Sequence, residues 1–331
     1  MILGFSVGSA VVDGLRDAFA VPACVYALAS VGLNVQFGYA GLLNFGHVAS
    51  GLVGAYGAAI TVNSGGSLWL GIIIGIVAAA VLGLLLGLPT LRLRADYLAI
   101  ATISVAEILR VLANSARLQS VTGGPIGISN VADDFFAINP IPRGRYGWGS
   151  FSYNQNSLWT MIVGWTLVVI ACLIVWRLTR SPWGRLLKAV REDEEATRAL
   201  GKNVFAMKLQ AFVLGSVFGG IAGILFIFDG GFVKPDFFVA QTTFNWYLVV
   251  ILGGVATVLG PPVGAILFWF VISLFNSLLS QAIGENGWWI ISSTDTGAVR
   301  YVFVGIAIVL LLVFRPQGIL GNKDEALIGD R

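Results

Sequence analysis

Runs of mostly apolar residues, each about as long as a membrane-crossing helix, recur along nearly the whole chain. A helix needs about 20 such residues to cross the hydrocarbon core of a bilayer, and its backbone hydrogen bonds are then satisfied internally. We therefore expect an all-α, polytopic integral membrane bundle of about eight to ten transmembrane helices, forming a single membrane domain over residues 1–331. The expected spans lie near residues 18–36, 44–63, 68–88, 96–113, 157–177, 209–228, 244–260, 263–283 and 299–314.

Glycine and proline modify two of these spans. The run 244–283 is too long for one crossing, and Gly260-Pro261-Pro262 divides it, because proline lacks a backbone donor and clashes with the preceding turn. The glycine-dense segment 37–63 leaves two alternatives open, a clean span or a broken or re-entrant helix. Only 11% of the residues are charged, against about 25% in soluble domains. Because the expected spans and short loops use up the length, no separate soluble domain fits.

Lys and Arg residues are unevenly distributed among the loops. Thirteen lie in the segments 89–95, 177–208 and 315–331, and four lie in the segments 114–156, 229–243 and 284–298. Cytoplasmic loops of membrane proteins carry the excess of basic residues. We therefore expect a cytoplasmic loop at 178–208, a cytoplasmic tail at 315–331 and an extracytoplasmic loop at 114–156. Alternation then places the N-terminus outside, unless 37–63 is re-entrant.

Residues 181–201 have the pattern of an amphipathic helix or helix pair. Ser181 and Pro182 are typical of a helix start, and Gly201 of a left-handed C-terminal cap. Acidic and basic residues four apart can pair on one face, as in Lys188/Glu192, Arg191/Glu195 and Glu194/Arg198. The alternative is a solvated loop whose charges only set topology. We favour a helix that binds a soluble cytoplasmic partner through the candidate coupling residues Arg185, Lys188, Arg191, Glu194, Glu195, Ala196, Arg198 and Gly201.

Several polar residues lie within expected spans. Glu107 and Arg110 are three apart and can pair on one helix face. Because an ionisable group costs about 2.5–3.5 kcal/mol at the bilayer centre on insertion scales, they are candidates either for the transport pathway or for a structural tie between helices. Asn34, Asn44 and His47 are candidate pathway residues around the glycine-dense segment, with bridging of helices as the alternative. Gly215, Gly219 and Gly223, at four-residue steps, predict close helix packing.

Some kinds of chemistry have no support in the sequence. His47 is the only histidine, and Cys24 and Cys172 both lie in apolar runs, so we expect neither a metal site nor a disulfide. The chain has no GxxxxGK[ST] phosphate-binding loop and no plausible catalytic cluster. We therefore expect no cofactor or ATP on this chain, no enzyme activity and no nucleic-acid partner.

The cytoplasmic loop resembles a known pattern. GRLLKAVREDEEATRALGKNVFAMKLQAF (184–212) is similar to the loop by which permeases of ABC importers dock on their ATPase subunits. Glu195-Ala196-Thr197 followed by Gly201 fits the Glu-Ala-Ala…Gly spacing of that loop, with Thr in place of the second Ala. The later Leu-Pro of the broader pattern is absent, which suits the branched-chain amino acid branch better than the maltose-type branch.

Four further segments resemble the LivM-type branched-chain amino acid permeases, in the same order along the chain. They are GYAGLLNFGHVASGLVGAYGAA (38–59), LRLRADYLAIATISVAEILR (91–110), TGGPIGI (122–128) and FRPQGILG (314–321). The resemblance covers nearly the whole chain, and it is less specific for the substrate than for the family, because relatives carry urea, short amides and other small zwitterions.

The resemblance implies a multi-pass permease subunit in the bacterial inner membrane that moves branched-chain or similar hydrophobic amino acids inward by alternating access. It implies a second, related permease, two ABC ATPases that hold ATP and Mg²⁺, and an extracytoplasmic amino-acid-binding protein, besides membrane lipid. Two rival classes are an ion-coupled secondary transporter, for which only Glu107 offers a midplane group, and an integral-membrane enzyme, for which the chain lacks catalytic residues.

Overall fold

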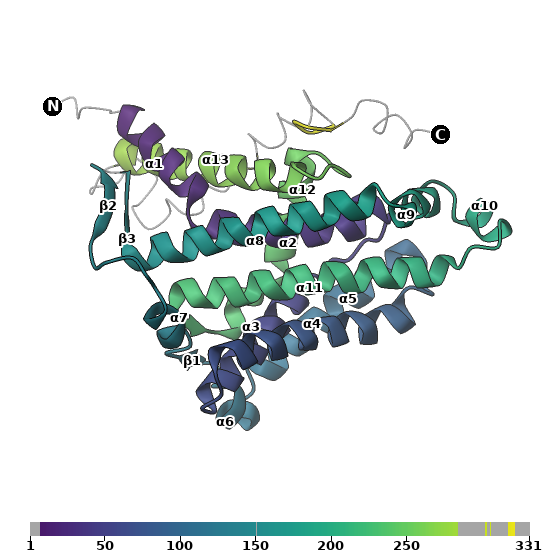
Figure 1. Ribbon diagram of the computed structural model, residues 1–331, viewed down its shortest axis with the longest axis horizontal. Helices are drawn as coiled ribbons and strands as arrows, with labels where there is room; N and C mark the ends of the chain where they lie inside the picture. The colour runs from purple at the N-terminus through teal and green to yellow at the C-terminus, as the bar shows by residue number, and fades with distance from the viewer. Residues whose placement is uncertain (1–6, 150, 284–301, 303–304, 306–316, 322–331) are drawn as a thin grey trace.

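The computed structural model describes residues 7–149, 151–283, 302, 305 and 317–321. Long helices lie side by side along one axis, and the short elements gather at the two ends of the bundle (Figure 1). The helices are α1 (Val7–Phe19), α2 (Val21–Asn34), α3 (Val48–Asn63), α4 (Leu68–Thr90), α5 (Ala95–Ala113), α6 (Gln119–Thr122), α7 (Asp133–Ala137), α8 (Gln155–Thr179), α9 (Pro182–Glu192), α10 (Glu194–Ala199), α11 (Val204–Gly230), α12 (Ala240–Gly253) and α13 (Gly260–Ile283).

The prediction of an all-α membrane bundle is confirmed. Five helices in the described part are long and apolar enough to cross a membrane, or six if α5 and the segment Ala116–Thr122, bent by 60°, form one broken span. The apolar helix α3 is shorter, with 16 residues, and α12 has 14 residues. The expected span at 299–314 lies outside the described residues, so the total of eight to ten stays a prediction.

The glycine-dense segment is broken. α2 continues into the π-helix η1 (Val35–Tyr39), after which residues 40–47 form no regular helix and α3 begins at Val48. Gly41 has a φ of +69°, a left-handed conformation that suits glycine, and it turns the chain after η1. Of the two alternatives for 37–63, the broken helix is therefore the observed one.

One helix was not expected. α1 lies beside α13 (Figure 1), and two serines of α13 bond its acidic residues: the Ser273 Oγ donates to the Asp17 carboxylate at 2.6 Å, and the Ser277 Oγ to that of Asp13 at 3.1 Å. Because these carboxylates interrupt its apolar pattern, α1 is not recognisable as a span.

Small elements lie at the end of the bundle opposite α9 and α10 (Figure 1). The hairpin β2 (Arg145–Trp148) and β3 (Phe151–Asn154) leads into α8, and β1 (Ile128–Ser129) pairs with β4 (Phe232–Val233). Ile128 lies opposite Val233, so the loop after α5 is tied to the loop after α11. These loops occupy the end that the Lys and Arg distribution assigns to the outside.

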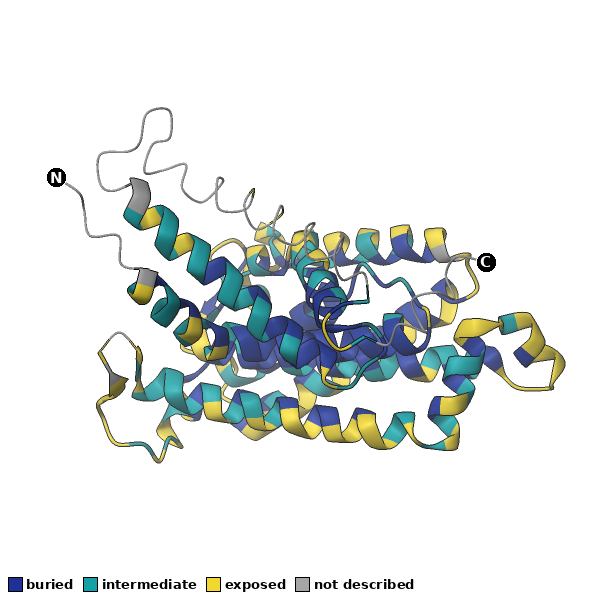
Figure 2. Ribbon diagram, turned by 90° about the horizontal axis from the view of Figure 1, so that it is seen from above, coloured by how far each residue is buried: buried dark blue, intermediate teal, exposed yellow. Residues whose placement is uncertain are grey.

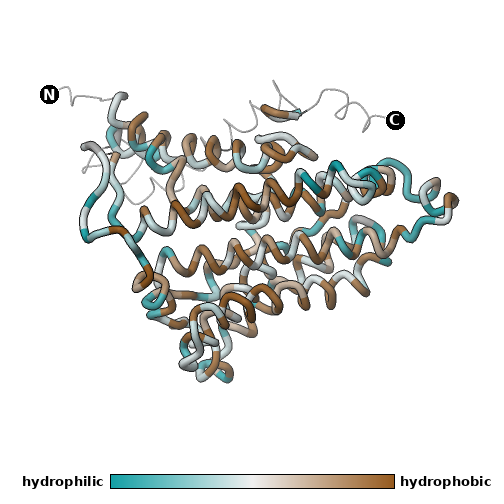
Figure 3. The backbone as a smooth tube through the Cα atoms, in the orientation of Figure 1, coloured by the Kyte–Doolittle hydropathy of each residue, from teal (hydrophilic) through white to brown (hydrophobic). Residues whose placement is uncertain are grey.

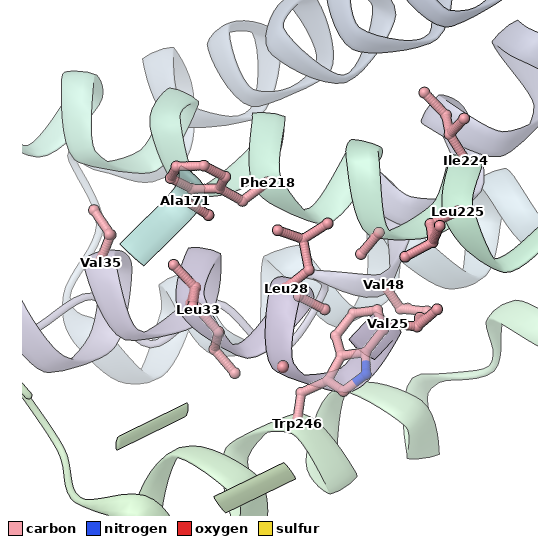
Figure 4. Close-up of a cluster of buried hydrophobic side chains, with 14 of the residues drawn as sticks. Val25, Leu28, Leu33, Val35, Val48, Ala171, Phe218, Ile224, Leu225 and Trp246 are labelled. Carbon is pink, nitrogen blue, oxygen red and sulfur yellow. The ribbon is translucent and has the colours of Figure 1, made fainter. Parts of the chain in front are cut away.

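The core lies where α2, α3, α4 and α11 meet, and buried residues concentrate there (Figure 2). Leu28 of α2 and Phe218 of α11 are 1% and 4% exposed, and Trp246 of α12 closes the cluster (Figure 4). The outward side chains of α4 are also apolar: Trp69 and Leu85 are 66% and 63% exposed. A surface of this kind suits lipid, and the hydrophilic residues are at the ends of the bundle and in the α9–α10 loop (Figure 3).

Candidate functional site

The loop between α8 and α11 folds into two helices that project from one end of the bundle (Figure 1). α9 begins at Pro182, after Ser181 with extended backbone angles. The chain breaks at Asp193, whose carboxylate caps α10 by accepting from the Ala196 backbone N–H at 2.9 Å. Gly201 follows α10 with a φ of +75°. Of the two forms that the pattern allows, the structure has the helix pair, with the predicted glycine cap.

α9 is anchored by its apolar face. Leu187 and Val190 are 0% and 3% exposed, and the Trp183 indole Nε1–H donates to the Gln210 amide oxygen on α11 at 2.8 Å. Ser181 does not cap α9 through its side chain; its hydroxyl donates to the Leu178 carbonyl instead, at 2.7 Å. The buried side chains fix α9 against the membrane helices, so a displacement of α9 would be transmitted to these helices.

α10 is tied to α11 through Glu194. Its carboxylate accepts from Arg198 at 2.8 Å, the predicted pair four residues apart, and also from Lys208 of α11. Lys208 has only 17% of its side chain exposed, whereas Arg198 has 65%. Glu195 and Ala196 are both exposed on α10. The helix therefore offers its outer surface to solvent and is held to the bundle from its inner side.

Arg191 and Lys188 connect α9 to the π-helix η1. The Arg191 Nη1 donates to the Gly38 carbonyl oxygen at 2.6 Å, and the Lys188 ammonium lies 6.0 Å from the centre of the Tyr39 ring. The expected partner of Arg191, Glu195, lies on the other helix of the pair, beyond the break at Asp193. Arg191 thus bonds the backbone of a membrane helix rather than an acid on its own helix.

The candidate pathway residue Asn34 holds the end of α2 to the turn between α12 and α13. Its amide nitrogen donates to the Thr257 carbonyl at 2.8 Å, and its amide oxygen accepts from the Ala256 N–H at 2.9 Å. Gly38 packs so closely on Asn34 that it leaves no room for a side chain. A Cβ at Gly38 would meet the Asn34 Oδ1 and would come within 2.7 Å of the Ala256 nitrogen. Asn34 is 1% exposed and bridges α2 to this turn, and a part in the pathway stays a prediction.

Asn44 and His47 are likewise buried, at 2% and 0% exposure. Asn44 donates to the Gln36 amide oxygen at 2.9 Å, and Gln36 in turn donates to the Phe212 carbonyl of α11 at 2.8 Å. The His47 Nε2 lies 3.2 Å from the Ala29 carbonyl oxygen. These side chains join the broken segment 35–47 to α2 and α11 in this conformation, and a part in the pathway stays a prediction.

The glycines of α11 bring these polar groups against that helix. A Cβ at Gly215 would come within 2.5 Å of the Gln36 Nε2, and one at Gly219 within 2.9 Å of the His47 Nε2. Gly223 faces the Gly51 backbone of α3 with equally little room. The predicted packing stripe therefore exists, and it packs against the segments that carry the buried amides.

Glu107 and Arg110 pair on α5 as predicted. The guanidinium donates to both carboxylate oxygens of Glu107, at 2.6 and 3.0 Å, and to Asp236 at 3.0 Å. Asp236 lies in the 3₁₀ turn η3 (Pro235–Phe238), so Arg110 ties α5 to the loop after α11. Glu107 has 48% of its side chain exposed and Arg110 20%.

At the end of the bundle opposite α9 and α10, Tyr153 of β3 makes a contact between the hairpin and α1. Its hydroxyl donates to the Arg16 carbonyl, and burial raises the pKa of Tyr153 to about 12. The Arg16 Nε donates to Asp17 at 2.9 Å. The hydroxyl stays protonated at neutral pH, as its donor role requires, and the contact holds the β2–β3 hairpin against α1.

Sequence reasoning missed three side chains that bond the predicted residues, Gln36, Lys208 and Asp236. It also missed Thr243, which bonds the backbone next to His47. Gln36 carries a signal comparable to that of Asn34, since it is an amide within an apolar run. Thr243, whose hydroxyl accepts from the Val48 N–H at 3.0 Å, and Asp236 have no such signal. In the described part of the chain, no three His, Cys, Asp or Glu residues could hold a metal ion, and both cysteines are free.

Comparisons with known proteins agree with this architecture. A family model described as "Branched-chain amino acid transport system / permease component" matches residues 15–312. The high-affinity branched-chain amino acid transport permease LivM of Escherichia coli K12 is 34% identical over 307 residues, covering 89% of this chain and 68% of LivM. A probable LivM of Methanocaldococcus jannaschii is 27% identical over 344 residues, covering 90% and 91%.

Relatives named LivH are also similar to this chain. LivH of Salmonella typhimurium is 23% identical over 317 residues, covering 90% of this chain and 92% of LivH. The family match spans most of the sequence, and the chain belongs to the permease family of branched-chain amino acid transport systems.

Proposed function

We propose that this permease is the LivM-like membrane subunit of an ATP-driven importer, and that it moves branched-chain amino acids into the cytoplasm by alternating access. Its family and its LivM relatives support the substrate class. The observation that carries the proposal is the helix pair α9–α10, which projects from the bundle while Arg191 and Lys208 connect it to membrane helices.

The connections suggest how the pair would work. Closure of two ATPase subunits on ATP and Mg²⁺ would displace α9 and α10. Arg191 would carry the displacement to η1 at the end of α2, and Glu194 would carry it to α11 through Lys208. Both α2 and α11 lie in the centre of the bundle, so their tilt would change access to the pathway.

The remaining parts would come from other chains. A second permease of the LivH type would complete the pathway in the inner membrane, and similarity of this chain to both LivM and LivH supports such a pair. An extracytoplasmic binding protein would deliver the substrate to the outer end, near the 114–156 loop. Specificity would rest mainly on that protein, because no amino-acid site stands out in the sequence of this chain.

Affinity purification of the tagged chain from mild detergent, with mass spectrometry of co-purifying proteins, tests the assembly. We expect two ATPases and a second permease. A chain that purifies alone or as a self-oligomer after gentle crosslinking would contradict the proposal and leave the charges of 178–208 as topology signals.

Uptake into proteoliposomes tests the energy source and the substrate. Import of radiolabelled L-leucine should require ATP, the ATPases and the binding protein. Import that survives ATP depletion but collapses with an uncoupler would favour the ion-coupled alternative. ATP-dependent import of urea or a short amide in place of leucine would keep the importer and replace the substrate.

A further inference from the structure

A cavity of about 270 Å³ lies at the cytoplasmic end of the bundle, between the coupling helices and the membrane helices. Its lining comes from five parts of the chain: the turn after η1, the α4–α5 turn with the start of α5, and α9, α10 and α11. The two helices that would receive the motion of the ATPases therefore form one wall. A molecule in the cavity would touch both the moving and the fixed side.

The cavity combines apolar walls with charges of both signs. Leu42, Leu98 and Val190 are each no more than 4% exposed and form apolar surface. Arg94, Arg191, Lys208 and Glu194 supply three positive charges and one negative charge. Ligand sites fix the orientation of a ligand through a few polar groups, and this lining offers charged groups beside its apolar ones, with more polar than apolar surface.

The charged groups differ in how many ion pairs and hydrogen bonds they already make within the protein. Glu194 neutralises Lys208 and also pairs with Arg198. Arg191 uses its Nη1 for the Gly38 carbonyl, but a guanidinium has five N–H donors. Arg94 is exposed, and within the described residues its side chain has no hydrogen bond or ion pair. The cavity therefore holds an excess of positive charge, with arginine donors free for a carboxylate.

We propose that this cavity binds a free α-amino acid with a branched apolar side chain from the cytoplasm, and that the bound amino acid inhibits further import. The ligand carboxylate lies against Arg94 and Arg191, its ammonium group against Glu194, and its side chain against Leu42, Leu98 and Val190. The ligand is the product of transport, so the inference rests on the proposed function. It adds a regulatory site on the permease itself.

The inhibition follows from the position of the cavity. A ligand that bridges the α4–α5 turn and α9 stabilises the arrangement in which these two segments have their present separation. A ligand shifts a conformational equilibrium only by its difference in affinity between the states. Motion of α9 relative to the turn dismantles the site, so the occupied importer resists that motion and its ATP-driven cycle slows as cytoplasmic product accumulates.

The test uses the complete importer in nanodiscs with its ATPases and with binding protein saturated by L-valine. ATP hydrolysis is measured as free L-valine is raised further. We expect inhibition of the intact importer, and about tenfold more valine for half-inhibition of Arg94→Gln, because a lost charge-assisted hydrogen bond weakens binding by that order. Hydrolysis without excess valine should be unchanged in this variant.

Arg92→Gln is the matched control. Arg92 lies two residues away on the same turn, with its guanidinium 5.7 Å from the centre of the Phe205 ring, and it does not line the cavity. The control should keep the inhibition of the unmodified importer. L-Valinamide, which lacks the carboxylate, should not inhibit. Equal inhibition of the Arg94 and Arg92 variants by valine would overturn the proposal.

Titration calorimetry of the permease–ATPase complex without binding protein gives a second readout. L-Valine should bind to the complex, and the Arg94→Gln complex should bind it about tenfold more weakly. Heat from inorganic phosphate with none from valine would overturn the amino-acid assignment. Absence of ATP-driven uptake in the intact importer would refute the proposed function itself, whereas normal uptake with no effect of excess valine would refute only this site.

Discussion

Arg191 of α9 and Gly38 of the π-helix η1 are joined by a hydrogen bond of 2.6 Å, from the guanidinium Nη1 to the backbone carbonyl oxygen. The bond spans 153 residues of sequence. π-Helical turns occur often at functional sites because they insert an irregular turn into a helix. A side chain of α9, the proposed coupling helix, therefore holds the point at which α2 departs from regular α-helix, where a small displacement can redirect the helix end.

Replacing Arg191 by Gln should uncouple ATP hydrolysis from transport. The charge-assisted bond contributes about 1.5–3 kcal/mol, so we expect at least about tenfold slower uptake. Co-purification with the ATPases and basal ATP hydrolysis should persist. The measurement is uptake per ATP hydrolysed in proteoliposomes.

Lys202→Gln is the control for Arg191, because it removes an exposed basic residue of the same loop whose side chain has no hydrogen bond or ion pair within the described residues. Its uptake per ATP should stay close to that of the unmodified chain. A matched loss in both variants would show that the loop needs positive charge in general rather than the contact with Gly38.

Replacing Gly201 by Pro should abolish uptake while leaving the chain in the membrane. Gly201 has a φ of +75°, whereas proline is fixed near −65°. The end of α10 would have to reorient, and with it the surface offered to an ATPase. Uptake and membrane content should be compared with Gly201→Asn, since Asn tolerates the left-handed conformation better than other residues. Normal uptake by the proline variant would rule out a positional role for this cap.

The local features of α10 show which parts of the structure the sequence can predict. The cap at Gly201 and the pair of Glu194 with Arg198 are local, with spacings that follow from helix geometry, and both were predictable. The apolar run 68–88 likewise predicted α4, Leu68–Thr90, because its length matches a bilayer. Local periodicity and composition therefore fix most helices and their ends.

Contacts between distant segments carry no comparable pattern. Arg191 reaches Gly38 and Arg110 reaches Asp236 across 153 and 126 residues, and each is decided by how helices pack. Asp193 breaks the expected run 181–201 because its carboxylate caps α10, so the spacing of Arg191 and Glu195 no longer implies a shared face. The hairpin β2–β3 was also missed, since a short strand pair at a loop end leaves no long apolar run.

Reversing the charge of Glu195 to Lys should lower uptake by reducing association with the ATPases. Glu195 is exposed on the projecting helix α10, and opposite charges across an interface steer and orient association. The measurement is the amount of ATPase that co-purifies, over a range of salt concentrations. Glu192→Lys, an exposed acid at the end of α9, is the control, and normal uptake by the Glu195 variant would argue against docking through this face.

Glu107→Gln should lower uptake without loss of assembly. The Glu107 carboxylate is 48% exposed on the side of α5 that also presents Ile108 and Val111, at 56% and 54%. A carboxylate that faced lipid there would cost about 2.5–3.5 kcal/mol on insertion scales, so we expect this face to meet a partner permease or the aqueous pathway.

Asp236→Asn, which removes the other carboxylate bonded to Arg110, separates a role in the pathway from a structural role. If the cluster is only a structural tie, both variants should lower the melting temperature of the solubilised chain alike and leave uptake per assembled complex unchanged. A fall in uptake confined to the Glu107 variant would place that carboxylate in the pathway.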